Sequence, residues 1–261
     1  MRLLALALCC ALAAPAAAQE QPPREIPIDV PSPIPVGFLV AWKPALVSVR
    51  VDSGAGSQFG SDKFQPLRAL VRYSTTAFNQ KLLARAELEG GGLQTDTQGT
   101  TLGSNGADLT ARLLGGIVQR ISPGLNITAT AGFITRYQWG TEAQGGAPRI
   151  GIFGAASNLE VEYRIAPLLA VEAYVEGALA PLPYAAQHNL GVLSDASELK
   201  ARLQLSIDIA PSAAVDFGYD FTRWHATFAG SSVLDPGGSA DKALLVESRD
   251  HALTIGLRWK P

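Results

Sequence analysis

Apolar and polar residues alternate along Leu125–Gln138 for much longer than in an ordinary globular strand. This stretch reads LNITATAGFITRYQ, with leucine, isoleucine, alanine or an aromatic residue at nearly every second position. A period of two held over this length is about twice a typical strand of 5–6 residues. A tilted strand that crosses a bilayer needs about 9–11 residues, apolar toward lipid and polar on the other side. The pattern therefore predicts a membrane-spanning strand.

The turn before this strand recurs along the chain. The segments Ile121–Pro123, Ile165–Pro167 and Ile209–Pro211 all read Ile-Ser/Ala-Pro and are evenly spaced. Each separates two alternating stretches, so the sequence predicts a series of hairpins joined by short turns. The predicted strands are Ala45–Val51, Leu67–Ser74, Lys81–Glu89, Asp108–Arg120, Leu125–Gln138, Ile152–Arg164, Leu169–Leu179, Glu198–Ile209, Ala213–Trp224 and Arg249–Trp259.

Longer connections rich in Gly, Ser and Asp alternate with these short turns. We expect them at 52–66, 90–107, 139–151, 180–197 and 225–248. Short turns on one side and long loops on the other are typical of outer-membrane barrels. A soluble β-sandwich also alternates, but its strands are shorter and its connections need not sort in this way. The sequence therefore predicts an all-β, antiparallel, up-and-down transmembrane β-barrel of about ten strands, with eight to twelve possible, whose two termini are periplasmic.

Composition agrees with this fold and excludes one class of partner. The 261-residue chain is 47% hydrophobic and 17% charged, with a formal net charge of −2. Without a basic surface, nucleic acid is not expected as a partner. No apolar run reaches the roughly 18 residues of a spanning helix, except near the start of the chain.

The first 18 residues have the layout of a secretory signal peptide. Arg2 precedes an apolar run that ends in Ala16-Ala17-Ala18, which predicts cleavage before Gln19. A transmembrane anchor would need a longer run, and a lipoprotein signal would need a small residue before its cysteine. Cys9 and Cys10, the two cysteines of the chain, lie inside this segment, so we expect no disulfide or thiolate site in the mature protein.

Residues 19–44 are expected to form a periplasmic segment ahead of a barrel at 45–261. Gln21–Pro35 contains six prolines, which stiffen the backbone and cannot donate ladder hydrogen bonds. Phe38–Trp42 is apolar and stops at Lys43-Pro44. Its pattern fits an additional strand, a plug in the lumen or an interfacial segment.

The polar faces of the predicted strands carry charges of both signs. In Glu198–Ile209 one face is wholly apolar and the other wholly polar. Toward the lumen we expect the cations Arg50, Arg68, Arg72, Arg85, Arg112, Arg136, Arg164, Lys200, Arg202 and Arg258. We expect the anions Glu87, Glu89, Glu160, Glu162, Glu172, Glu176, Glu198, Asp208, Asp216 and Asp220 beside them. Balanced charges in so narrow a lumen should pair and close it, whereas a wide pore with one dominant sign would select ions.

Two groups of residues are predicted to act at the barrel's outer surface. Arg223, His225, Arg249 and His251 face outward by alternation, at the outer ends of two neighbouring strands. They can bind lipopolysaccharide phosphates, or they can be simply solvated. Aromatic residues near strand ends are expected in the two interfacial girdles; they are Tyr73, Phe78, Tyr137, Trp139, Tyr163, Trp224, Phe228 and Trp259.

Catalytic and cofactor motifs have little support in this chain. Ser197–Lys200 matches the S-x-x-K spacing of penicillin-recognising enzymes, but it lies on a predicted strand without their other motifs. No Asp-x-His pair lies in a predicted loop and no catalytic triad stands out. We therefore expect no cofactor, no metal and no enzymatic activity.

The last predicted strand resembles the C-terminal strand of bacterial outer-membrane β-barrel proteins. Leu253, Ile255, Leu257 and Trp259 share one face. The resemblance implies export by the general secretory route and insertion by the barrel-assembly machinery. The chain departs from the pattern because Lys260-Pro261 follow the aromatic residue that usually comes last.

These observations predict location better than activity. We expect a structural or interaction barrel of the outer membrane, docking periplasmic or outer-membrane proteins, for example in a secretion, adhesion or gliding-motility complex. A narrow channel for small solutes is the alternative, and an enzyme at the barrel rim is a more remote one.

Overall fold

The computed structural model describes residues 36–53, 56–96, 103–139, 150–186, 192–229 and 244–260. They form one antiparallel sheet. Its strands are β1 (Gly37–Trp42), β2 (Ala45–Ser53), β3 (Gly56–Gln65), β4 (Arg68–Ala77), β5 (Leu82–Asp96), β6 (Gly103–Ser122), β7 (Leu125–Trp139), β8 (Ile150–Ala166), β9 (Leu169–Ala186), β10 (Val192–Ala210), β11 (Ala213–Ala229) and β12 (Leu244–Trp259). No helix in these ranges is long and apolar enough to cross a membrane.

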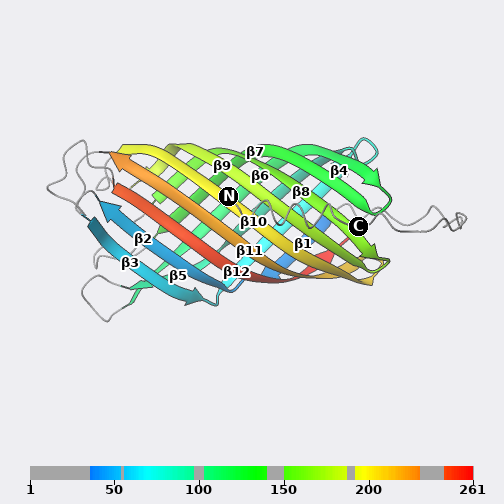
Figure 1. Ribbon diagram of the computed structural model, residues 1–261, viewed down its shortest axis with the longest axis horizontal. Helices are drawn as coiled ribbons and strands as arrows, with labels where there is room; N and C mark the ends of the chain where they lie inside the picture. Colours follow the sequence, from blue (N-terminus) through cyan, green and yellow to red (C-terminus); the bar gives the residue numbers. More distant parts are fainter. Residues whose placement is uncertain are drawn as a thin grey trace, which may run out of the picture. The chain divides into compact units, whose positions relative to one another are not determined.

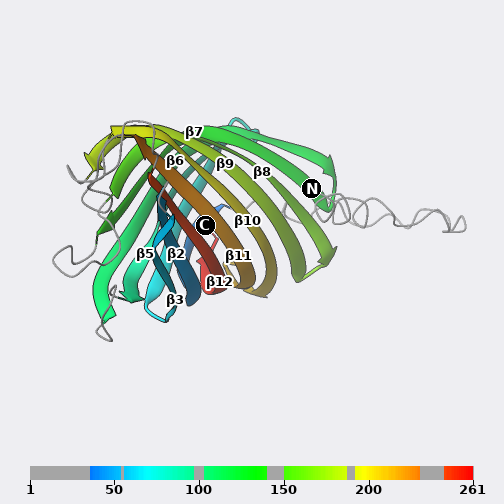
Figure 2. The same ribbon diagram turned by 60° about the vertical axis from the view of Figure 1, so that its left-hand side comes forward.

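The sheet closes on itself as a barrel of ten strands (Figure 1), as predicted. β1 and β2 act as one barrel strand, because both pair with β12 in the same register: Trp42 lies opposite Ile255, and Ala45 opposite Ala252. β3 and β4 act as another, since β3 pairs with β2 and β4 pairs with β1. From β5 to β12 each strand pairs with the next one along the chain, and Figure 2 shows these tilted strands side by side.

Two prolines divide the first two barrel strands. Pro44 separates β1 from β2 and Pro66 separates β3 from β4. Proline has no N–H for the ladder, so each interrupts backbone pairing locally. Pro44 still accepts a hydrogen bond from the backbone N–H of Leu253 at 3.0 Å, which keeps β12 attached across the break.

At Pro66 the wall changes its partner. After this residue β4 pairs with β5. Before it, in the described residues, β3 has no backbone pairing to β5. The side chain of Gln65 bridges the two strands instead. Its Nε2 donates to the Gln94 carbonyl oxygen at 2.8 Å, and the Gln94 backbone N–H donates to its Oε1 at 2.9 Å. One side-chain amide thus replaces one rung of the backbone ladder.

The short turns all lie at one rim of the barrel. They are Phe78–Lys81, Pro123-Gly124, Pro167-Leu168 and Pro211-Ser212, at the predicted positions. Phe38 at the start of β1 pairs with Trp259 at the end of β12, so β1 begins at the rim where β12 ends. The predicted Pro-rich part of the leading segment, Gln21–Pro35, lies outside the described residues, and so does the side chain of Trp139. The expected connections 90–107 and 180–197 are largely strand, since β5 ends at Asp96, β6 begins at Gly103, β9 ends at Ala186 and β10 begins at Val192.

The predicted alternation across the wall is confirmed along most strands. On β7, Asn126, Thr128 and Thr130 are buried in the lumen, whereas Phe133 is 57% exposed on the outside. On β10 the exposed residues Leu199 and Leu203 alternate with buried charged residues in the same way. An apolar belt therefore surrounds the barrel, as lipid requires of the outer face.

The structure corrects two boundaries of the predicted elements. The range 52–66, expected to be a loop, contains strand β3. Its sequence, GSQFGSDKFQ, does not alternate between apolar and polar residues. Asp62 and Gly60 lie on the outer face, and the inner face is not apolar either. Phe38–Trp42, whose role was open between three alternatives, is the barrel strand β1, so the wall begins at Gly37 rather than at Ala45.

The structure also reverses the predicted faces of several residues near the rim opposite the short turns. Arg50, expected in the lumen, is exposed on the outside, and its neighbours Val49 and Val51 are buried inside. Trp224 and Phe228, expected in an interfacial girdle, are also buried in the lumen. Beyond the lipid belt the outer face meets water and the inner face forms an apolar core. Apolar residues there face inward rather than outward.

Candidate functional site

The charged lumen is the largest cluster of functional groups in the described residues. The side chains predicted to form it are buried inside the barrel: Arg68, Arg72, Arg85, Arg112, Arg136, Glu160, Glu162, Glu172, Glu176, Lys200, Arg202, Asp216 and Asp220. Alternation on tilted neighbouring strands points them all inward. Oppositely charged groups from different strands therefore meet across the lumen.

Arg112 on β6 is the centre of this network. Its Nε donates to Glu176 on β9 at 2.7 Å, and its Nη1 donates to Glu87 on β5 at 3.2 Å. Its Nη2 donates to Glu198 on β10. Lys200 reaches the same region from β10, with its Nζ 3.0 Å from Glu87 and 2.6 Å from Glu89. The guanidinium thus joins strands from opposite sides of the barrel.

A second layer of ion pairs lies nearer the rim opposite the short turns. Arg68 donates two parallel hydrogen bonds to Asp108, at 2.6 and 2.9 Å, the bidentate geometry that suits arginine and carboxylate. Arg136 donates to Glu198 at 2.9 Å, and its guanidinium lies 4.9 Å from the ring centroid of Trp224. The cation–π contact links this layer to the apolar residues beyond it.

An apolar cluster fills the lumen beyond these ion pairs. Trp224 and Phe228 on β11 pack there with the valines of β2 and with residues from β5, β8, β10 and β12. The members are Ala45, Val47, Val49, Val51, Leu93, Ile150, Ile152, Ala196, Trp224, Ala226, Phe228, Val246 and Ala252. The lumen is therefore closed first by paired charges and then by packed apolar side chains.

Toward the short-turn rim the lumen holds further ion pairs, such as Arg85 with Glu160 at 2.8 Å and Arg258 with Asp216 at 2.7 Å, and buried amides beside them. The amide groups of Asn126, Asn158 and Gln204 are buried without a protein hydrogen-bond partner. Buried amides of this kind are ordinarily satisfied by ordered water.

Three charged residues of the network were not predicted from the sequence. Lys43 is 1% exposed and contacts Glu89 and Asp220. Asp108 pairs with Arg68, and Asp250 lies 3.5 Å from Arg136. Asp108 alternates in register with Arg112 and could have been found by extending that strand's pattern. Lys43 gave no such signal because Pro44 interrupts its strand.

The outward arginines predicted near the outer leaflet do meet. Arg223 on β11 and Arg249 on β12 lie directly opposite each other. Both donate through Nε to the same oxygen of Glu247, at 2.6 and 2.8 Å, which leaves their terminal nitrogens pointing away from this carboxylate. About half of each arginine side chain is exposed, whereas Glu247 is 11% exposed. Glu247 was missed, and it offsets part of the predicted positive charge.

The two predicted histidines do not join this arginine pair. His251 Nδ1 lies 2.6 Å from the hydroxyl of Tyr219. His225 lies between two residues of β10: its Nδ1 is 3.3 Å from Ser197 Oγ, and its Nε2 is 3.5 Å from Asp195 Oδ2. Alternation alone does not predict this contact, because it depends on the register between β10 and β11.

The predicted insertion signal lies on the outer face of β12. Leu253, Ile255 and Trp259 are 59%, 44% and 46% exposed, and Leu257 is partly exposed on the same face. The four residues form a continuous apolar strip on the last strand. The four residues thus share the outer face of the last strand, and their recognition by the assembly machinery stays a prediction.

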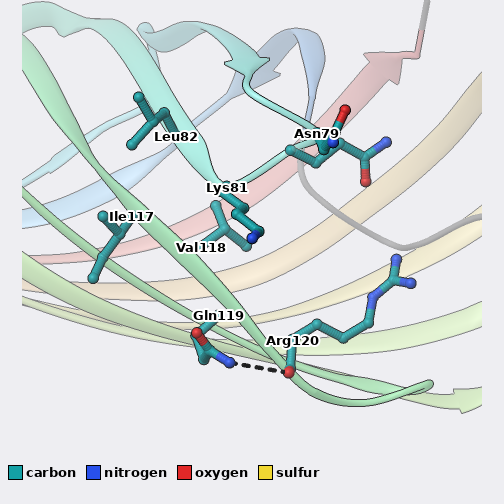
Figure 3. Close-up of a pocket in the computed structure, with 8 residues that line it drawn as sticks. Asn79, Lys81, Leu82, Ile117, Val118, Gln119 and Arg120 are labelled. Atoms are coloured by element: carbon teal, nitrogen blue, oxygen red, sulfur yellow. Dashed lines mark hydrogen bonds between the residues drawn. The ribbon is translucent and has the colours of Figure 1, made fainter.

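A groove at the short-turn rim carries two further cations (Figure 3). It is lined by Asn79 and Lys81 of the first turn, and by Gln119 and Arg120 near the end of β6. Residues Phe78, Asn79 and Gln80 have positive φ angles of 50°, 54° and 66°, a conformation that non-glycine residues rarely adopt. Lys81 and Arg120 are exposed, and nothing else in the groove points to a ligand.

The closed antiparallel barrel, its apolar belt and its charged lumen define the class of fold: an up-and-down β-barrel of the kind typical of bacterial outer-membrane proteins. No protein-family model matches the chain, and no curated protein matches it either. Its described residues include no cluster of His, Cys, Asp and Glu side chains that could hold a metal ion.

Solved structures with similar architecture share little sequence with this chain. The outer-membrane protease OmpT of Escherichia coli matches with a TM-score of 0.46 at 10% identity, covering 85% of this chain and 96% of OmpT. The translocator domain of the autotransporter NalP from Neisseria meningitidis matches with a TM-score of 0.42 at 10% identity, covering 87% and 89% of the two chains. The attachment invasion locus protein Ail of Yersinia pestis matches with a TM-score of 0.38 at 10% identity, covering 86% and 98%.

Arg112→Ala should strongly destabilise the barrel. The substitution leaves Glu87, Glu176 and Glu198 buried without their shared partner, and breaking a buried ion pair in this way costs about 3–5 kcal/mol. Unfolding by urea in detergent micelles, followed by tryptophan fluorescence, measures the change. Arg120→Ala, which removes an exposed arginine from the same strand, should change stability by less than about 0.5 kcal/mol. Equal effects of the two substitutions would contradict a central role for Arg112.

Proposed function

We propose that this protein is a closed barrel that serves the outer membrane as a structural and docking component and does not conduct solutes. The observation that carries this proposal is the filled lumen, in which paired charges are followed by an apolar plug. Export through a signal peptide cleaved after Ala18 is part of the proposal.

The energetics of the network favour a permanently closed state. A conducting path past Arg112 would require several of its ion pairs to separate together. Each separated pair leaves a buried charge without compensation, at a cost of roughly 3–5 kcal/mol. The apolar layer around Trp224 would also have to open. A selective pore, by contrast, keeps its charged groups around an open aqueous path.

Recordings in planar lipid bilayers test the closed state. The purified, folded protein should give no steady conductance steps, because both layers of the lumen block ions. A variant with Arg112, Arg136 and Trp224 all replaced by alanine serves as the comparison, after heat-modifiable migration on gels shows that it still folds. It should conduct more often than the natural protein. Large, steady steps from the natural protein would instead support the alternative, a narrow channel for small solutes.

A closed barrel can act only through its surfaces and through segments outside its wall. The Pro-rich segment Gln21–Pro35 is suited to docking, because an extended proline-rich backbone loses little conformational entropy on binding. We therefore infer that periplasmic or outer-membrane proteins bind the barrel through this segment or through its outer connections. Such a role is compatible with a trans-envelope complex for secretion, adhesion or gliding motility.

Affinity purification from detergent-solubilised membranes tests this docking role. The intact protein should retain specific envelope proteins, and a form lacking Gln21–Pro35 should lose those that bind the Pro-rich segment. Quantitative mass spectrometry of the two samples measures the difference. If neither form retained more envelope protein than an unrelated barrel retains in the same experiment, the docking role would be wrong.

A second part of the proposal concerns lipopolysaccharide. Arg223 and Arg249 lie directly opposite each other on the outer face of β11 and β12, and about half of each side chain is exposed. Two guanidinium groups in this position can hold a phosphate by charge-assisted hydrogen bonds. Glu247 holds both arginines in place through their Nε atoms, which orients their free ends toward such a ligand.

Replacing Arg223 and Arg249 together by alanine should reduce lipopolysaccharide co-purification several-fold. The physical reason is the loss of both phosphate donors. The lipopolysaccharide per barrel is measured after extraction in mild detergent. Lys81→Ala combined with Arg120→Ala provides a matched control, since these exposed cations lie at the opposite rim. If both double variants co-purified with equal amounts of lipopolysaccharide, the proposed role of the arginine pair would be wrong.

A further inference from the structure

The contact of Ser197, His225 and Asp195 has the chemistry of a hydrolytic site. A serine hydroxyl, an imidazole and a carboxylate lie in series, with distances of 3.3 Å between Ser197 Oγ and His225 Nδ1 and 3.5 Å between His225 Nε2 and Asp195 Oδ2. This order of nucleophile, base and orienting acid is the one that activates serine in unrelated folds. Such hydrogen bonds are often long in ligand-free enzymes and shorten when substrate binds.

We propose that Ser197, His225 and Asp195 form a catalytic site on the outer wall of the barrel that hydrolyses a carboxylic ester of an outer-leaflet lipid. The proposal goes beyond the docking role, because it needs neither the lumen nor a protein partner.

The strand geometry explains how these three residues meet. Asp195 and Ser197 are two residues apart on β10, so both face outward. His225 lies directly opposite Ser197 on β11. A register shift in β10 between Leu193 and Asp195 displaces the strand at this point. Irregularities of this kind re-aim side chains, and here Asp195 comes to lie on the far side of the imidazole from Ser197.

The imidazole can accept the serine proton in one of its two neutral tautomers. With its proton on Nε2, His225 donates to Asp195 and leaves Nδ1 as the acceptor for the Ser197 hydroxyl. Asp195 then stabilises the imidazolium that forms when the proton moves. The side chains of His225 and Asp195 are 32% and 64% exposed, so the site is open to a substrate from the membrane.

The depth of the site points to a lipid substrate. On the side of the short turns, the outward residues of β10 are apolar, and Leu199 and Leu203 are 48% and 59% exposed. Leu179 on β9, directly opposite Ser197, is 66% exposed. On the other side the wall becomes polar, with Asp195. Ser197 therefore lies at the boundary between an apolar surface that can hold an acyl chain and a polar surface, which is where lipid esters lie.

Arg223 can assist the reaction from the neighbouring position on β11. It is diagonal to Ser197 across the strand pair, a separation of about 7–8 Å at Cα that a long arginine side chain can span. Its terminal nitrogens can stabilise the negative oxygen that develops on the ester carbonyl, or the phosphate of the same lipid.

The proposed reaction balances without any further cofactor. Ser197 Oγ attacks the ester carbonyl carbon while its proton passes to His225 Nδ1. The bond from this carbon to the alcohol oxygen breaks, and the alcohol leaves with the proton from the imidazolium. Water then attacks the acyl-serine with His225 as base, which releases the fatty acid and restores Ser197.

A fluorophosphonate probe tests the nucleophile directly. The folded protein in detergent micelles should be labelled, and mass spectrometry should locate the adduct on Ser197. Ser197→Ala should abolish the labelling, whereas Ser157→Ala should not, because Ser157 is an exposed outward serine on β8, a strand that carries neither His225 nor His251. His225→Gln should slow labelling by roughly 10²–10⁴-fold, the usual contribution of a general base. Labelling that persists in Ser197→Ala, or no labelling in the natural protein, would overturn the proposal.

Fatty-acid release identifies the lipid. The natural protein and Ser197→Ala are incubated separately with glycerophospholipid vesicles and with lipopolysaccharide. Release that depends on Ser197 from either pool supports the proposal and distinguishes the two sources of ester. Release from neither pool would contradict a lipid ester as the substrate. These results are independent of the bilayer and affinity experiments, so the closed, docking barrel and the hydrolytic site can fail separately.

Discussion

The pairing of buried charges inside a narrow barrel is the constraint on which the rest of this structure depends. Within the lipid belt the strands cannot expose polar side chains on their outer face, and every backbone N–H and C=O must be hydrogen-bonded between strands. Charged side chains on these strands must therefore face the lumen, where isolated charges would be costly. Arg112 shows how the cost is offset, because one guanidinium serves carboxylates from β5, β9 and β10. The same contacts that make the charges tolerable also tie distant strands together and close the lumen.

The polarity of the wall reverses along its length, and this moves the functional chemistry outward. Through the lipid belt the barrel is apolar outside and charged inside. Near the opposite rim β2 has Val47, Val49 and Val51 inside and Arg50 outside, as a soluble protein would. At the level where the two regimes meet, arginine, glutamate, serine and histidine side chains gather on the outer faces of β10 to β12. A lumen filled by charged and apolar side chains and an outer band of polar side chains are thus two results of one polarity pattern.

Sequence reasoning was reliable where a single rule governed a whole strand. In β7 and β10 lipid contacts one face throughout, so alternation alone identified the inward charges and the number of barrel strands. It failed for Arg50, Trp224 and Phe228, because periodicity reports which residues share a face but not whether that face meets lipid, water or core. It also failed for β3, whose Gly- and Ser-rich sequence forms a strand only through its pairing with β2. The contact of Ser197 with His225 was beyond reach, since it depends on the exact register of β10 against β11.

The Gln65 side chain that bridges β3 and β5 gives an otherwise continuous barrel a seam. A closed barrel normally has no sheet edge, and separating two of its strands means breaking a run of backbone hydrogen bonds at once. Within the described residues β3 and β5 share no backbone ladder, and Gln65 contributes two side-chain hydrogen bonds between them. Side-chain contacts therefore join the two strands at this seam, in place of the backbone pairing that joins the other strands of the wall. The barrel combines a rigid, electrostatically locked middle with one seam that depends on side chains.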